Sequence, residues 1–376
     1  MGRTALAGFG VGWVLALGLA STGQGFLNGD AAAYAAQGWA FDLAQRTTHL
    51  AYLLMASWLG VVAGPWLPWA LDLVSLGAAV CCVVQVTRLA RDPGVGCAGA
   101  VACVMPWCAF AEVDLIWSAL LLCALAANTA RQAAWWTALA VGTSPVALLL
   151  VPWMCARRGP RGVATGALAA VCALTVVTWG AWWWGDRGVV PGLIVEPGRL
   201  AEAAIIGLPW ALCVLWRPRA QVLWLLPVVL APPDIPVWIW LGFVWAMDVG
   251  GDAWGRRLAL ASVFLASFGL QERVARVQRE QAVLQEVVDS MGPQDGLVAP
   301  WSWGVRASVM ATGEAYGLRW RIPGPSLLGS QEARWCEARP SRVASLPPRA
   351  RWAQGGVVDD VGVHWSIEPP MEGCPR

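Results

Sequence analysis

The sequence of 376 residues contains no lysine and only two histidines, and charged residues make up only 13% of it. Soluble domains carry about 25% charged residues. The low charge and the 57% share of hydrophobic residues therefore exclude an ordinary soluble enzyme and indicate a polytopic membrane protein. The net charge is +2 and no basic stripe exists, which excludes a nucleic-acid partner. The exclusive use of arginine suggests the codon bias of a GC-rich bacterial genome.

Metal and redox motifs are also missing. Nine of the 11 cysteines lie before residue 214 in apolar runs, without the spacing of a zinc, haem or redox site. We interpret these nine as small apolar filler, and we expect no metal or cofactor, while dependence on a divalent metal stays open. Cys336 and Cys374 lie in the polar C-terminal part, and an oxidising periplasm would allow them to form a disulfide.

Apolar runs predict helices throughout the first 270 residues. The runs cover 5–20, 51–64, 66–87, 95–111, 115–130, 133–156, 162–184, 203–216, 220–231, 235–249 and 258–270. Several are shorter than the roughly 20 residues that a perpendicular crossing requires, so we expect short, broken helices that enclose a cavity. The first run could pass for a signal peptide, but we favour an uncleaved helix.

The distribution of arginines predicts the orientation. With the N-terminus inside, 11 arginines fall on cytoplasmic turns, and three (Arg46, Arg187 and Arg199) fall on outer loops. This count requires that 51–64 lies in the outer interface and that 133–156 crosses twice. The predicted fold is therefore a mainly α, polytopic membrane helical bundle with about 11 crossings in a bacterial inner membrane.

The C-terminal part differs in character, so we expect a transmembrane module over 1–270 and a small periplasmic α+β domain over 271–376. The segment Leu270–Met291 has helical periodicity. The short runs "LVAPWSW", "GVRASVMAT" and "GVHWSIEPP", separated by Gly and Pro, are interpreted as strands.

Ionisable residues of the membrane part gather in loops expected on the outer face. They are Asp30, Asp42, Arg46 and His49 in the first loop, Glu112 and Asp114 in the second, and Asp186, Arg187, Glu196, Arg199 and Glu202 in the fourth. Ionisable groups at membrane depth cost roughly 2.5–3.5 kcal/mol each, so they usually serve a function. We favour function for Asp30, Glu112 and His49, and a solvated loop end for Asp42, Asp186 and Glu202.

Four short motifs appear in order: "NGDAAAYAAQG", "THLAYLL", "AEVDLIW" and "VGTSPVALLL". This order resembles the GT-C superfamily of membrane glycosyltransferases, and most closely the bacterial protein O-mannosyltransferase-like family related to the eukaryotic transmembrane O-mannosyltransferases. Gly29–Asp30, His49 with Tyr52, and Ala111–Glu112–Val113 match that family's pattern. The prolines expected after His49 are missing, and Asp114 stands where a tyrosine is usual. The resemblance covers residues 1–156.

The resemblance implies transfer of a mannose-like hexose from a polyprenyl-phosphate carrier to an extracytoplasmic hydroxyl on a protein, lipid or glycan, with inversion. Asp30 would be the general base and Glu112 a second catalytic carboxylate. The side chains expected to bind the substrates are Arg46, His49, Tyr52, Asp114, Arg187 and Arg199. The cations among them would stabilise the leaving phosphate. The lipid-linked donor that the resemblance implies needs no nucleotide site, and no nucleotide-binding motif is evident in the sequence.

Two alternatives stay open. A transporter or flippase would use the outer carboxylates to bind a proton or cation, although no inverted repeat is visible. A catalytically inactive member would serve as an envelope scaffold, and the missing prolines favour that alternative. An assay with polyprenyl-phosphate sugars separates these alternatives from the enzyme.

Overall fold

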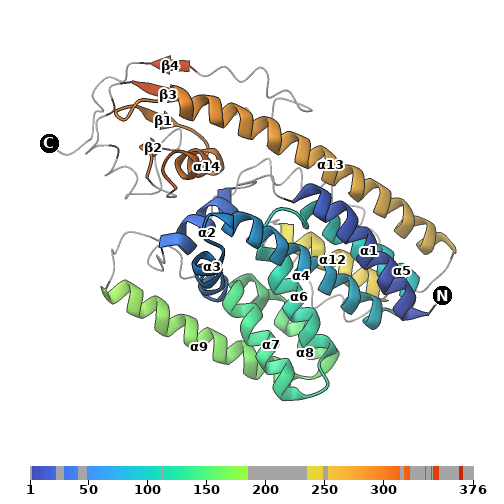
Figure 1. Cartoon of the computed structure of the whole chain (residues 1–376). Coiled ribbons are helices and arrows are strands. Elements are labelled where there is room, and N and C mark those ends of the chain that lie inside the picture. The colour runs from blue at the N-terminus through green and yellow to red at the C-terminus, as the bar shows by residue number, and fades with distance from the viewer. Residues whose placement is uncertain are drawn as a thin grey trace.

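The computed structural model describes residues 2–22, 29–40, 49–111, 113–184, 235–248, 253–313, 317–321, 335, 340, 342–346 and 364–366. The described part is mostly helical, with one small sheet near the C-terminus (Figure 1). The helices of the first part are α1 (Arg3–Ser21), α2 (Gly29–Ala40), α3 (Leu50–Ala63), α4 (Leu67–Leu89), α5 (Pro93–Val104), α6 (Val113–Ala126), α7 (Ala130–Thr143), α8 (Val151–Arg158) and α9 (Pro160–Trp184). They are followed by α12 (Ile235–Asp248), α13 (Ala253–Ser290) and α14 (Trp301–Thr312).

The 3-10 helices η2 (Gly64–Trp66), η3 (Met105–Trp107) and η4 (Pro145–Leu150) join or extend several of these elements. The predicted run 133–156 is broken where expected, because α7 ends at Thr143 and Pro145 cannot continue a helix. The predicted runs 203–216 and 220–231 lie outside the described residues. Whether 51–64 and 133–156 cross a membrane as expected stays a prediction.

Three described helical stretches are long and apolar enough to cross a membrane: Arg3–Ser21, Leu50–Leu89 and Gly255–Ser290. Large apolar side chains point outward from them, among them Phe9, Trp58, Val61, Phe264 and Leu265. In water such exposed apolar surface would be unfavourable, whereas a lipid environment would solvate it. The surface of these helices therefore fits a membrane protein.

Small residues allow the helices to approach closely. A Cβ added to Gly162 or Gly166 of α9 would lie 2.5 or 2.2 Å from the carbonyl oxygens of Ala130 and Ala134 in α7. Such backbone-to-backbone contact is typical of helix packing in membranes, where van der Waals contact replaces the hydrophobic effect.

The C-terminal part is an α/β unit. Its strands β1 (Gly296–Val298), β2 (Trp320–Arg321), β3 (Val343–Ser345) and β4 (His364–Ser366) form one sheet in the order β2-β1-β3-β4. β1 pairs in parallel with β2 and β3, and β4 is antiparallel to β3. The strand predicted for "GVRASVMAT" is wrong, because this segment is most of α14. Residues 303–309 of α14 are all buried, so no helical periodicity is visible in the sequence.

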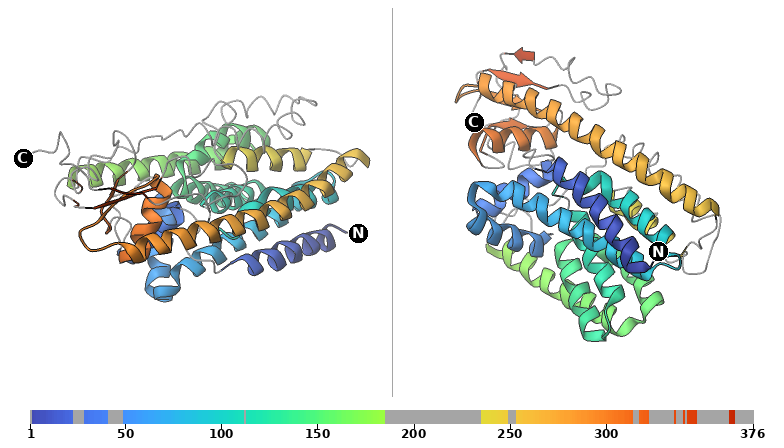
Figure 2. Two further views of the ribbon diagram at one scale, coloured as in Figure 1. Left: turned by 90° about the horizontal axis from the view of Figure 1, so that it is seen from above. Right: turned by 45° about the vertical axis from the view of Figure 1, so that its right-hand side comes forward.

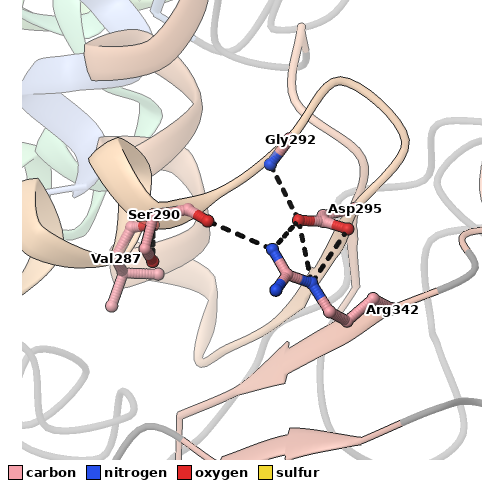
Figure 3. A network of polar contacts seen from close by, with 5 residues as sticks. All are labelled: Val287, Ser290, Gly292, Asp295 and Arg342. Carbon is pink, nitrogen blue, oxygen red and sulfur yellow. Dashed lines mark hydrogen bonds and ion pairs between the residues drawn. The ribbon is translucent and has the colours of Figure 1, made fainter.

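The turn before β1 is held by an ion pair (Figure 3). Asp295 accepts a hydrogen bond from the backbone N–H of Gly292 at 2.7 Å and pairs with Arg342 at 2.6 Å. Arg342 also donates to the carbonyl of Ser290, the last residue of α13. The Arg342 guanidinium lowers the pKa of the Asp295 carboxyl, and the Gly292 N–H adds to this effect.

α13 and α2 join this unit to the helical body. α13 is one helix of 38 residues that passes without a break through the expected domain boundary at 270/271. Figures 1 and 2 show it running from the sheet to the region of the N-terminus. α2 packs on α3 with Ala31, Tyr34 and Ala35, while Ala32, Ala33 and Ala36 join the core of the α/β unit. The α/β unit is therefore docked on the helix that begins at Gly29.

Candidate functional site

Asp30 lies in the first turn of α2 and not in an extended loop, so the loop expected over 21–50 contains a helix. The sequence predicted no helix there because an alanine-rich stretch of 12 residues has no apolar stripe. The first turn of a helix stabilises a negative charge through the exposed backbone N–H groups. Position 30 precedes Tyr34 by one turn, so both lie on one face of α2.

Tyr34 brings this face of α2 to two residues of the second motif. Its ring lies edge-on to His49, with centroids 5.5 Å apart, and edge-on to Tyr52, with centroids 4.8 Å apart. Tyr34 and Tyr52 are both buried. The first and second motifs therefore form one cluster of aromatic and polar side chains.

His49 connects this cluster to the fourth motif, "VGTSPVALLL". Its Nδ1 lies 2.8 Å from the carbonyl oxygen of Thr143, the last residue of α7. A carbonyl oxygen only accepts, so we assign a proton to Nδ1 in this contact. The contact satisfies one of the carbonyls that the end of a helix leaves without an intrahelical donor.

Tyr52 connects the same cluster to the segment before Glu112. Its hydroxyl donates to the carbonyl of Ala111 at 3.4 Å. Ala111 has φ of 48°, the only positive φ of a non-glycine residue among the described residues. This conformation costs an alanine roughly 1–2 kcal/mol, and such strain often accompanies functional sites. The strained residue directly precedes the predicted catalytic Glu112.

Asp114 lies in the first turn of α6 and accepts a hydrogen bond from Trp117 Nε1 at 2.8 Å. This partner lies within the same helix, so the observed bond orients the carboxylate locally. It neither supports nor contradicts the substrate-binding role predicted for Asp114.

Arg273 of α13 is a cation near this segment that the sequence analysis missed. Its guanidinium lies 4.0 Å from the ring centroid of Trp107 and 4.2 Å from that of Phe110, and it donates to the carbonyl of Pro106 at 3.3 Å. Stacking on two aromatic rings stabilises the cation and the turn together. The only signal in the sequence was an arginine shortly after the last apolar run.

The remaining predicted residues lie outside the described residues. They are Glu112, Arg46, Arg187 and Arg199, together with Cys336 and Cys374. For Asp30 the structure describes the backbone position alone. The structure thus joins parts of three predicted loops, through His49, Tyr52, Ala111 and Thr143, and leaves the complete set of site residues a prediction.

The opposite end of the helical body is rich in arginine. There Arg256 pairs with Asp92 at 2.9 Å, and Arg157 pairs with Asp248 at 3.1 Å. Arg3 donates to the carbonyl of Ala90. α5 begins beside Asp92 and leads through η3 to Ala111, so it separates these arginines from the aromatic cluster. Whether the two ends face opposite sides of a membrane stays a prediction.

No protein-family model, curated protein or solved structure matches the chain.

Proposed function

We propose that the protein is an integral membrane glycosyltransferase of GT-C type that uses a polyprenyl-phosphate-linked hexose. The main support is the meeting of four separate motifs at one end of the helical body, opposite the end that carries Arg157 and Arg256. His49 contacts Thr143 and Tyr52 contacts Ala111, while Tyr34 contacts both of them from the helix that carries Asp30.

In the proposed reaction, Asp30 accepts the proton of the acceptor hydroxyl. The acceptor oxygen forms a bond to the anomeric carbon while the bond from that carbon to the phosphate oxygen breaks, and the configuration inverts. The polyprenyl phosphate leaves with the negative charge, which cationic groups stabilise. The position of Asp30 in the first turn of α2 is compatible with this role, because a helix N-terminus favours a negative charge.

The membrane setting belongs to the same proposal. A donor with a polyprenyl tail remains in the bilayer, so the site has to lie at a membrane surface. We propose that the arginine-rich end faces the cytoplasm and that the aromatic cluster and the α/β unit lie in the periplasm. In that orientation the α/β unit would cover the outer face of α2, next to the site.

The test is an assay of the purified full-length protein in detergent. We would supply a polyprenyl-phosphate hexose or the corresponding nucleotide hexose, with hydroxyl acceptors of peptide, glycan and lipid type. The proposal predicts transfer from the lipid-linked donor alone, with release of polyprenyl phosphate. Turnover with the nucleotide sugar, or no release from any polyprenyl-linked hexose, would contradict it.

A further inference from the structure

Two thiols meet between α4 and α6, away from the residues proposed for glycosyl transfer. Sγ of Cys81 and Sγ of Cys123 are 3.5 Å apart. Both side chains are half-buried and both thiols are free. From the sequence they are expected to be apolar filler, because 42 positions separate them and their contact depends on how α4 packs against α6.

The two sulfur atoms differ in the polar groups that lie near them. The side-chain amide of Gln85 points Nε2 at Cys123 Sγ, 4.0 Å away. Arg88, one turn further along α4, lies with Nη1 3.5 Å from Gln85 Oε1. An N–H donor at a sulfur atom and a nearby cation both favour the thiolate over the thiol. Cys123 is therefore the better nucleophile, and Cys81 lies within contact distance of it.

Other cysteines of the described part lack this arrangement. Cys97 donates its S–H to the carbonyl of Leu6 at 3.1 Å, Cys108 to that of Met105 at 3.3 Å, and Cys82 to that of Leu115 at 3.9 Å. A sulfur atom that donates to a carbonyl is held as a thiol, and burial makes it less reactive. These three cysteines fit the structural role expected from the sequence.

We propose that Cys81 and Cys123 form a redox-active dithiol that low-molecular-weight disulfides oxidise to an intramolecular disulfide. The Cys123 thiolate attacks the small disulfide, forms a mixed disulfide and releases one small thiolate, which takes up the proton lost by Cys123. Cys81 then loses its proton and attacks the sulfur of Cys123, which releases the second small thiol. Two protein thiols are oxidised and one small disulfide is reduced to two thiols.

Forming the disulfide requires only a small movement of the two helices. The sulfur atoms must approach from 3.5 Å to the bonded distance of about 2.05 Å. The bond would tie α4 to α6, the helix that begins directly after Glu112. If Arg88 lies on the cytoplasmic side, the pair is in a reducing compartment, where disulfides are usually transient and respond to oxidants.

The experiment uses the full-length protein in detergent, reduced and then freed of reductant. Oxidised glutathione is added, remaining thiols are alkylated at intervals, and the digested protein is analysed by mass spectrometry. We expect a linked Cys81–Cys123 peptide in the wild type and in Cys82→Ser, the matched neighbour. Cys81→Ser should accumulate glutathione on Cys123, and Gln85→Leu should slow the loss of the Cys123 thiol several-fold.

The controls distinguish a change in thiol reactivity from misfolding of the variant. Each variant must elute in size-exclusion chromatography like the wild type, and alanine replaces serine where it does not. If both thiols of the wild type are still fully alkylated after treatment with oxidised glutathione, the proposal is overturned, and a link through Cys82 would overturn it too. Wild-type modification of Cys81 in Cys123→Ser would overturn the assignment of Cys123 as the attacking sulfur. None of these readouts depends on glycosyl transfer, so they stand apart from the proposed function.

Discussion

At the scale of single residues, we propose two roles for His49 that substitution can separate. Nδ1 contacts the Thr143 carbonyl at the end of α7, and Nε2 is proposed to act on the substrate. The amide of asparagine can imitate Nδ1 but does not reach the place of Nε2, whereas phenylalanine has neither nitrogen. The pair His49→Asn and His49→Phe therefore separates the two roles.

We expect His49→Asn to keep the thermal stability of the wild type and to lose transfer activity. His49→Phe removes the donor to Thr143 and should lower the free energy of unfolding by roughly 1–2 kcal/mol. The measurement is thermal unfolding in detergent, followed by size-exclusion chromatography, alongside the transfer assay. Full activity in His49→Asn would show that Nε2 has no part in the reaction.

Asp295 gives a pH-dependent prediction for the α/β unit. Arg342 lowers its pKa in the folded state, below the value of about 3.9 that an unfolded chain has. Its contribution to stability is therefore complete above pH 4 and is lost as the pH falls through the folded pKa.

Asp295→Asn should lower the stability at neutral pH only modestly, because it removes an ion pair whose arginine is half exposed to solvent. It should also flatten the stability profile below pH 4. Limited proteolysis across this pH range, at the junction of α13 and β1, measures both effects. An unchanged profile in the variant would assign the acid sensitivity to another group.

At the scale of elements, the sequence predicted most helices because apolar runs mark them directly. α1, α4, α9 and α12 lie within a few residues of their predicted ranges. α2 was missed because its two faces bury small alanines against different cores, which leaves no single apolar stripe. The helical pattern of Leu270–Met291 was predicted, but its continuity with the run 258–270 was missed, because hydropathy falls at Gln271 and a domain boundary was placed there.

The candidate site was predictable only as a set of motifs. Residues such as Asp30 and His49 stood out because charge is rare in this chain. The observed contacts of the cluster, however, run from His49 to the backbone carbonyl of Thr143 and from Tyr52 to that of Ala111. No side-chain pattern encodes a carbonyl partner. The role of Arg273 depends in the same way on tertiary packing against Trp107 and Phe110.

The contact between α7 and α9 predicts the effect of one added methyl group. In Gly166→Ala the Cβ would lie 2.2 Å from the backbone oxygen of Ala134, so the helices must separate. Overpacking of this kind costs about 1–3 kcal/mol. Gly77→Ala on α4 is the matched control, since no atom lies within 4 Å of the added Cβ.

The expected result is a lower melting temperature for Gly166→Ala and an unchanged or slightly higher one for Gly77→Ala, because alanine favours the helix by roughly 0.5–1 kcal/mol. Thermal unfolding in the same detergent compares them. Equal melting temperatures would mean that α7 and α9 do not pack as closely as the structure has them.

At the scale of the whole molecule, the arginine-rich end and the aromatic end predict an orientation. Reporter fusions after Ala90 and after Ser290 should report the cytoplasm and the periplasm, respectively. The physical reason is that arginines near helix ends are retained on the cytoplasmic side. Both fusions reporting the same compartment would contradict the orientation, and a reversed pair would place the proposed site on the cytoplasmic side.

The central claim is that Asp30 acts as the base in transfer from a polyprenyl-phosphate hexose. The most direct measurement compares the turnover of Asp30→Asn with that of Asp92→Asn, a matched change at the arginine-rich end. Asparagine still caps a helix, so Asp92→Asn should keep near wild-type turnover. Asp30→Asn, which cannot accept the proton, should lose about 10²- to 10⁴-fold in turnover while it still binds the donor. Wild-type turnover in Asp30→Asn would contradict the claim and leave Asp30 as a charge that only marks the start of α2.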